Sequence, residues 1–319
     1  MLNKLFFFTI AFFLSNFLFK RFISKSSKLF LDIPNKRSMH TIPTPRGGGI
    51  VFITNIIITS LIYIFFYGVS KKLIIPFLIL PLGITGFIDD INNVSPKIKY
   101  IIQLITCFLI FSTSNLFLKL DFNITNVSIA IFMIIAFTAV INFVNFMDGI
   151  DGLVASCMFI SIFTTCIVLE IEQSYIFLLG SLISFIILNW HPAKLFMGDS
   201  GSTFLAAINL SLICLSNDFI QAFNLLLVLS PLLIDPFICV IRRFMNKQEI
   251  FLPHKQHFYQ RLNQAGWTHN KVSILYLICS LLISLSYFLS GLKFSIFTFM
   301  VCFSYCFWLN YKIAVPFKK

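Results

Sequence analysis

Long apolar runs separated by short polar stretches follow one another along the whole chain. A run of about 20 apolar residues is long enough to cross a bilayer as a helix. Eleven such spans are predicted, at 5–19, 48–66, 73–88, 100–118, 128–144, 153–170, 174–189, 203–217, 221–241, 273–290 and 294–311. The first is followed by "KRFISKSSK" with no small-residue cleavage pattern, so we expect a retained helix rather than a signal peptide.

The composition indicates the same class of protein. Hydrophobic residues make up 58% of the 319 residues and charged residues only 11%. A soluble chain of this length would need far more polar residues to cover its surface. We therefore predict an all-α, polytopic integral membrane protein with about 11 transmembrane helices, forming a single domain over 1–319. The eight cysteines show no metal-site spacing and are expected to be packing residues.

Lysine and arginine set the expected orientation. Most of the 24 basic residues fall in alternate loops, at 20–46, 97–99, 194, 242–271 and 312–319. Because basic loops stay in the cytoplasm, we predict an N-terminus outside and a cytoplasmic C-terminus. The formal net charge of +12 then describes a cytoplasmic face suited to anionic lipid heads and phosphates, with no nucleic acid partner.

Acidic residues gather on that same predicted side. Asp89 and Asp90 end the third span, Asp148 and Asp151 lie between the fifth and sixth, and Asp199 precedes the eighth. A charge within hydrocarbon costs about 2.5–3.5 kcal/mol on insertion scales. Capping of a helix end would explain any one of these residues, but five together suggest a shared purpose.

The ligand types favour a hard cation at these loops. Carboxylate and amide oxygens suit Mg²⁺, with Mn²⁺ as the alternative, and Asn142 and Asn145 lie beside the acidic residues. Glycine lets backbone amides approach phosphate oxygens closely. The nearby glycines are Gly149, Gly152, Gly198, Gly201 and the run 47–49. The sequence thus predicts diphosphate chemistry at the membrane surface, with the active site on the cytoplasmic face.

Five ordered motifs in these loops resemble the polyprenyl-phosphate N-acetylhexosamine-1-phosphate transferases, the MraY and WecA superfamily of glycosyltransferase family 4. They are "DIPNKRSMHTIPTPRGGG" (32–49), "GFIDDINNVSPKIKYIIQ" (86–103), "NFVNFMDGIDGL" (142–153), "HPAKLFMGDSGS" (191–202) and "PHKQHFYQRL" (253–262). The first and last of these are closer to the WbpL-like branch than to MraY.

The resemblance implies transfer of an N-acetylhexosamine 1-phosphate from a UDP-sugar to undecaprenyl phosphate, with Mg²⁺ and release of UMP. The sugar would be GlcNAc or a 6-deoxy sugar such as QuiNAc or FucNAc. The product would initiate a lipid-linked surface glycan such as the O-antigen of lipopolysaccharide. The implied location is the bacterial inner membrane, with cytoplasmic catalytic loops; a homodimer is left open.

Roles follow residue by residue from the same resemblance. The implied catalytic set is Asp89, Asp90, Asp148, Asp151, Asp199, His254 and His257. Within it, Asp89 matches the proposed base for the lipid phosphate, and Asp199 would ligate the metal beside Asn145. The predicted substrate-binding set is Arg46, Gly47, Lys97, Asn189, Lys194, Phe196 and Arg261; within it, the basic residues Arg46 and Lys194 are expected from their charge. Lys97 matches a phosphate contact, and Asn189 and Phe196 match positions near the uracil.

The histidine loop departs from the family pattern, since His254 and His257 stand where MraY-like members carry three consecutive histidines. A peptidoglycan-type phospho-MurNAc-pentapeptide transferase is therefore the less favoured alternative. A transporter would need charges near the bilayer midplane and an inverted repeat, and neither is visible. A non-catalytic relative is a further alternative.

Outside these motifs, Asp235 would pair with Arg242 or Arg243, or line the site.

Overall fold

The computed structural model describes residues 2–26, 30–34, 38–115, 123–171, 174–250, 252 and 254–317, and the predicted all-α polytopic class is confirmed. The helices are α1 (Leu2–Ser26), α2 (Gly49–Tyr67), α3 (Lys71–Leu78), α4 (Leu80–Ile91), α5 (Pro96–Thr113), α6 (Ile124–Phe146), α7 (Leu153–Val168), α8 (Ser174–Asn189), α9 (Gly198–Ile213), α10 (Phe219–Met245), α11 (Phe258–Gln264) and α12 (His269–Lys312). The strands β1 (Leu31–Asp32) and β2 (Thr44–Pro45) pair antiparallel. Residues 35–37 of the first motif and Pro253 of the last lie outside the described residues.

Each predicted span falls largely on a helix. The span 73–88 covers α3 and α4, whereas α12 contains two predicted spans. Within α12 the backbone leaves helical geometry at Gly291 (φ 68°, ψ −152°), and Cys279 and Cys302 from its two halves line one cavity, so the chain turns back there. In the described chain, seven helical segments are long and apolar enough to cross a membrane, with α7 and α8 shorter. The count of eleven spans stays a prediction.

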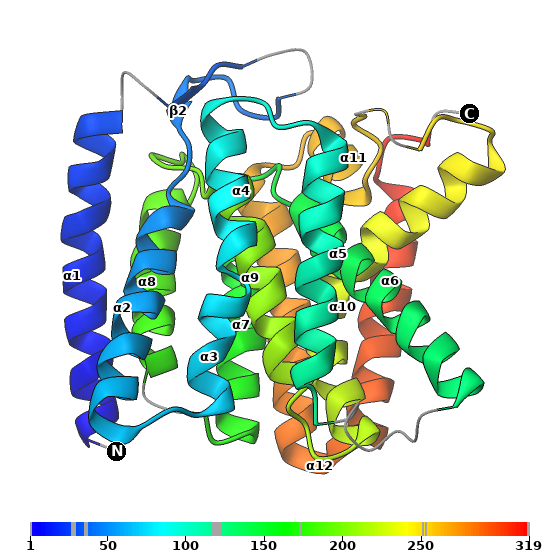
Figure 1. Cartoon of the computed structure of the whole chain (residues 1–319). Coiled ribbons are helices and arrows are strands. Elements are labelled where there is room, and N and C mark those ends of the chain that lie inside the picture. Colours follow the sequence, from blue (N-terminus) through cyan, green and yellow to red (C-terminus); the bar gives the residue numbers. More distant parts are fainter. Residues whose placement is uncertain are drawn as a thin grey trace.

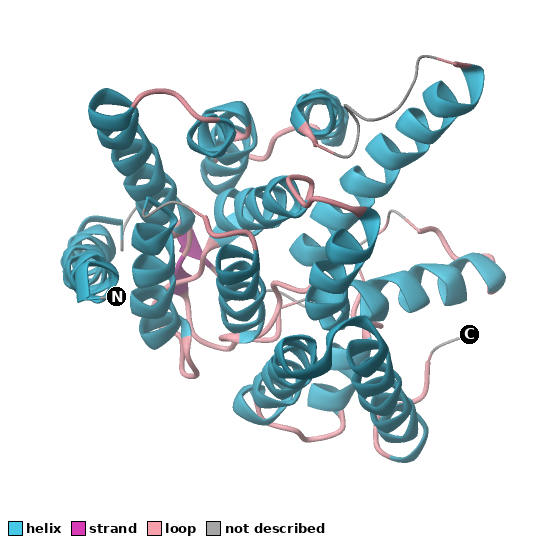
Figure 2. Ribbon diagram, turned by 90° about the horizontal axis from the view of Figure 1, so that it is seen from below, coloured by secondary structure: helices cyan, strands magenta, loops and turns pink. Residues whose placement is uncertain are grey.

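The motif-bearing loops meet at one end of the helical bundle. In Figure 1 the strand pair, the α4–α5 connection and α11 lie at the upper end with the C-terminus, and the N-terminus lies at the lower end. From below, most helices are seen nearly end-on, with the two-stranded sheet at the side near α1 (Figure 2). Termini at opposite ends fit the predicted topology; which end faces the cytoplasm stays a prediction.

Helix α9 forms the centre of the bundle, because all of its residues from Ser200 to Ile213 are buried. It packs against α2, α4, α6 and α7. Its one strongly polar core residue, Asn209, donates a hydrogen bond from Nδ2 to Ser161 Oγ on α7 at 2.6 Å. Between apolar helices in lipid, such a bond satisfies groups that would otherwise be buried without a partner.

Two glycines let neighbouring helices reach the first turn of α9. A Cβ added at Gly49 would lie 2.4 Å from the Gly201 backbone, and one at Gly86 would lie 2.5 Å from Ser200 Cα. Both distances are shorter than side-chain atoms tolerate, so only glycine allows α2 and α4 this close. Gly49 and Gly201, expected from sequence to expose amides to phosphate, therefore have a packing role.

Replacing Gly49 by alanine should destabilise the protein because the new methyl group meets fixed backbone rather than a flexible side chain. Overpacking of this kind costs typically 1–3 kcal/mol. The melting temperature in detergent measures the effect. Gly266→Ala is the control, since its φ is +93° and no atom lies within 4 Å of the added Cβ, so only backbone strain of roughly 1–2 kcal/mol is expected. An unchanged melting temperature for Gly49→Ala would contradict the packing role.

Candidate active site

The first turn of α9 is held by the carboxylate of Asp90 from the end of α4. Asp90 Oδ1 accepts from the Asp199 amide at 3.0 Å, and Oδ2 accepts from the Ser200 amide at 3.3 Å and Ser200 Oγ at 2.8 Å. An anionic side chain at a helix N-terminus satisfies free amides and complements the helix dipole. Gly198, with φ +75°, leaves room for this carboxylate. Buried Asp90 thus positions Asp199 rather than facing the open side of the site.

Lys99 joins the two carboxylates expected to carry the chemistry. Its Nζ lies 2.5 Å from Asp89 Oδ2 and 2.8 Å from Asp199 Oδ2. Asp89 Oδ1 also accepts from the Val94 amide at 2.8 Å, which fixes its rotamer. The first turns of α5 and α9 and the last turn of α4 thereby converge on one ammonium group. The ammonium between the two carboxylates offsets their mutual repulsion.

Asp148 lies in the loop that joins α6 to α7, and within the described structure no hydrogen bond or ion pair reaches its carboxylate. Burial, and after it the charge of Asp199, raises the pKa of Asp148 to about 8. A carboxylate in this position favours a proton or another cation. Nearby, Asn145 at the end of α6 accepts from Ser202 Oγ at 2.5 Å, which holds its amide beside the first turn of α9.

Asp151, the second acidic residue of this loop, is buried and faces two histidines. Its Oδ2 lies 2.6 Å from His191 Nδ1 and 3.2 Å from His269 Nδ1, and it accepts from the Ala193 amide at 3.2 Å. The two aspartates of the motif therefore have different surroundings. Asp148 faces the charge of Asp199, whereas Asp151 binds the segment after α8 and the start of α12.

Asn189 ties two loops together. Its Oδ1 accepts from the Gly152 amide and its Nδ2 donates to the Leu195 carbonyl, both at 2.9 Å. The side chain is buried, and both its oxygen and its nitrogen are hydrogen-bonded. Phe196 is half-buried, and its ring meets the His40 ring edge-on with centroids 4.9 Å apart. Lys194 beside it is exposed.

Arg46 and Gly47 follow β2 and connect the strand pair to the centre of the site. Arg46 donates from Nε to the Asp90 carbonyl at 2.8 Å. Gly47 is buried with φ +88°, a conformation that L side chains rarely adopt, and its Cα faces the Phe87 ring. The Phe196 amide donates to the Pro45 carbonyl at 2.8 Å, which docks this segment on the loop before α9.

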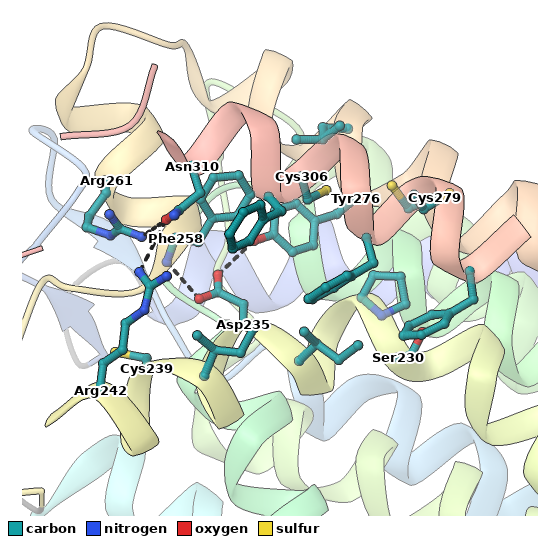
Figure 3. Close-up of a pocket in the computed structure, with 18 of the residues that line it drawn as sticks. Ser230, Asp235, Cys239, Arg242, Phe258, Arg261, Tyr276, Cys279, Cys306 and Asn310 are labelled. Atoms are coloured by element: carbon teal, nitrogen blue, oxygen red, sulfur yellow. Dashed lines mark hydrogen bonds between the residues drawn. The ribbon is translucent and has the colours of Figure 1, made fainter. Parts of the chain in front are cut away.

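The histidine loop is built on Asp235 rather than on an arginine partner. Asp235 accepts from the Phe258 and Tyr259 amides at 2.7 and 3.0 Å and from the Tyr276 hydroxyl at 2.7 Å, so it caps α11 (Figure 3). His257, buried beside it, has Nδ1 3.8 Å from Asp235 Oδ1. One of the two predicted alternatives was an ion pair between Asp235 and Arg242 or Arg243, and the described chain does not show it.

His254 stacks near His257, with ring centroids 4.8 Å apart. Burial, and then the charge of His257, lowers the pKa of His254 to about 4. At neutral pH it can form hydrogen bonds but adds no positive charge. Arg261 donates to the Gln256 and Val315 carbonyls at 3.1 and 3.0 Å. It also donates to Asn310 (Figure 3). Its guanidinium therefore fixes the C-terminal segment.

Comparison with known proteins identifies the family of this chain. The profile of glycosyl transferase family 4 matches residues 72–217, which contain Asp89, Asp148 and Asp199. A Bacillus subtilis (strain 168) protein described as a probable undecaprenyl-phosphate N-acetylglucosaminyl 1-phosphate transferase is 30% identical over 274 residues, covering 78% of this chain and 74% of the relative. The chain belongs to glycosyl transferase family 4.

Two other relatives of this family 4 protein carry different descriptions. A phospho-N-acetylmuramoyl-pentapeptide-transferase of Staphylococcus haemolyticus (strain JCSC1435) is 31% identical over 259 residues, covering 72% of this chain and 79% of the relative. A decaprenyl-phosphate N-acetylglucosaminephosphotransferase of Mycobacterium leprae (strain TN) is 26% identical over 289 residues, covering 76% and 72%. The MraY and WecA superfamily is thereby confirmed, the WbpL-like branch stays a prediction, and a transporter is left without support.

The family 4 site brings together most of the residues predicted from sequence, but not all of them. Asp89, Asp90 and Asp199 meet around α9. Lys97 is exposed and has no partner in the described chain; Lys99, which sequence reasoning passed over, takes the central position. The sequence feature that points to Lys99 is its spacing from Gln103. The two residues are four positions apart and so share one face of a mainly apolar helix. His269 was also missed.

Asp148→Asn should make the stability of this family 4 protein less dependent on pH. The folded-state pKa of about 8 lies above the ordinary 3.8, so protonated Asp148 favours folding. That contribution is fully present below 3.8 and is lost as the pH rises through about 8. The variant should therefore match the unmodified chain at acidic pH and melt at a higher temperature above pH 8.

Melting temperatures in detergent across this range test the Asp148 prediction. Glu249→Gln, which removes an exposed carboxylate outside the site, is the control and should show no such widening difference. A constant difference between Asp148→Asn and the unmodified chain at all pH values would refute the assignment.

Proposed function

We propose that this protein transfers an N-acetylhexosamine 1-phosphate from a UDP-sugar to undecaprenyl phosphate at the cytoplasmic face of the bacterial inner membrane. An oxygen of the lipid phosphate attacks the β-phosphorus of the UDP-sugar. The bond from that phosphorus to the bridging oxygen breaks, and UMP leaves with the electron pair. The expected donors are UDP-GlcNAc or a UDP-linked 6-deoxy sugar such as QuiNAc or FucNAc, and the expected product initiates O-antigen-type glycan synthesis.

The observation that carries the proposal is the Asp89–Lys99–Asp199 chain of ion pairs at the end of the bundle where the family motifs meet. Transfer between two phosphates requires charge neutralisation and alignment more than new covalent chemistry. Because carboxylates hold the Lys99 ammonium on both sides, its position is set before substrate binds. The names of the relatives, which describe transfer onto polyprenyl phosphates, support the same reaction class.

The donor set fits Mg²⁺. Asp199, Asp148 and the amide oxygen of Asn145 are hard oxygen ligands, and no histidine or cysteine of the described chain contacts Asp199. Burial and the charge of Asp199 raise the pKa of the Asp148 carboxylate to about 8, and a nearby cation would offset that charge, which supports the assignment. When bound, Mg²⁺ would neutralise the diphosphate and the departing UMP. Mn²⁺ would suit the same ligands.

The remaining groups act by positioning. Asp89 forms an ion pair with Lys99 at 2.5 Å. We propose that Asp89 orients Lys99 toward the lipid phosphate. That phosphate is already an anion near neutral pH. Asp90 supports Asp199 through the first turn of α9, and Arg46 is anchored to the Asp90 carbonyl beside it.

The first experiment measures UMP release by purified protein in detergent with undecaprenyl phosphate, Mg²⁺ and a panel of UDP-sugars. Asp199→Asn should lower release by about 100-fold or more, because the charge it supplies is needed in the transition state. Glu249→Gln is the matched control outside the site and should retain activity.

The donor panel separates this proposal from its alternatives. UDP-MurNAc-pentapeptide is included because one relative is described as a phospho-N-acetylmuramoyl-pentapeptide-transferase. Release with that donor alone would assign the peptidoglycan-type reaction instead. Folded protein that releases no UMP with any donor would indicate a non-catalytic relative.

A paired substitution tests the central position of Lys99. Lys99→Gln leaves Asp89 and Asp199 without a shared cation, so UMP release should fall by about 100-fold. Lys97→Gln changes an exposed residue two positions away and should have a much smaller effect. The opposite order of effects would show that Lys97 makes the phosphate contact that the resemblance implies. Melting temperatures of both variants control for loss of fold.

A further inference from the structure

Three side chains from distant parts of the sequence converge on one point beside the candidate active site. Asp151 comes from the α6–α7 loop, His191 from the segment after α8, and His269 from the first position of α12. One ligand atom from each lies within 4.8 Å of the other two. Asp151 and His269 are buried, whereas the His191 side chain is 41% exposed, so the group opens to solvent on one side.

The hydrogen bonding of His269 leaves one of its nitrogens without an ordinary partner. Its Nε2 lies 3.2 Å from the Met39 carbonyl oxygen, which can only accept, so Nε2 carries the proton. The other nitrogen, Nδ1, is buried, makes no hydrogen bond with any described residue, and lies 3.2 Å from Asp151 Oδ2. A neutral imidazole would therefore turn a lone pair toward a carboxylate. A cation between the two atoms removes that conflict.

The surroundings of His269 match those of a metal-bound histidine. Ligating histidines donate their second ring N–H to a carboxylate, a backbone carbonyl or water, which fixes the tautomer and the ring orientation. The Met39 carbonyl has this role here. The Asp151 carboxylate is likewise fixed, since the Ala193 amide donates to it at 3.2 Å.

We propose that Asp151, His191 and His269 form a binding site for one zinc-type divalent cation, with the fourth position open on the side of His191. Two imidazoles and one carboxylate with an open position suit Zn²⁺ and the neighbouring late transition metals rather than Mg²⁺. The site differs from the all-oxygen group around Asp199. Bound metal would join the α6–α7 loop to the segment before α9 and the start of α12. The proposal does not rest on the proposed transferase function.

Zinc binding by itself provides the test. Purified protein in detergent is treated with a chelator, dialysed and titrated with Zn²⁺ alone by calorimetry. We expect one equivalent to bind the unmodified chain and affinity to fall by at least about tenfold in His191→Gln. Because His191 is partly exposed, this variant should keep its fold, and its melting temperature without metal checks that. Zn²⁺ should raise the melting temperature of the unmodified chain but not that of His191→Gln.

Two control variants identify the site. His40→Gln removes another histidine at the same end of the molecule, and Cys239→Ser changes the second cluster of metal-binding side chains, Cys239, His254 and His257. Both should bind Zn²⁺ as the unmodified chain does. Co²⁺ serves as a second probe, and the intense visible absorption of a four-coordinate ion should disappear in His191→Gln.

The proposal is overturned if the unmodified chain binds no Zn²⁺, or if His191→Gln binds it equally well. It is also overturned if binding is lost in Cys239→Ser and kept in His191→Gln, because that result places the ion at the second cluster. A weak Co²⁺ spectrum typical of six-coordinate aqueous cobalt would likewise contradict it.

Discussion

The docking of the first turn of α9 onto α2 and α4 is the contact on which the site depends. Gly49 and Gly86 bring two helix backbones against that turn, and the Asp90 carboxylate then binds its free amides. These contacts place Asp199 opposite Lys99. Any side chain at either glycine would separate the helices, lengthen the Asp90 bonds and move Asp199. The packing of the helix backbones therefore also fixes the positions of the charged groups.

Charge balance explains how five acidic residues can share this end of the bundle. Asp90 accepts hydrogen bonds from helix amides, Asp89 and Asp199 share one lysine, and Asp151 faces two imidazoles. Of these five, only Asp148 lacks a partner in the described chain, and burial together with the charge of Asp199 raises its pKa to about 8. The acidic residues differ mainly in what opposes their charge. The group opposite each carboxylate therefore sets its role, which ranges from structural support to facing a cation.

The sequence predicted the helices because membrane spans are defined by composition over many residues, which tertiary contacts do not alter. It also located the carboxylates, since charge is rare in this chain. It did not choose between Lys97 and Lys99, because that choice depends on the rotation of α5 against α4 and α9, which is set by packing. Asp235 shows the same limit, as its true partners are amides of α11 that no side-chain pattern indicates.

Residues that meet only in three dimensions account for the largest gap. His191 and His269 belong to different loops, and neither has metal-ligand spacing along the chain. They approach Asp151 because Asn189 holds the Gly152 and Leu195 backbones together and because α12 begins beside that loop. The same aspartate motif thus presents Asp148 toward the all-oxygen group at Asp199 and Asp151 toward nitrogen ligands. In the two proposals, these neighbouring carboxylates with different surroundings would place two kinds of cation on one short loop.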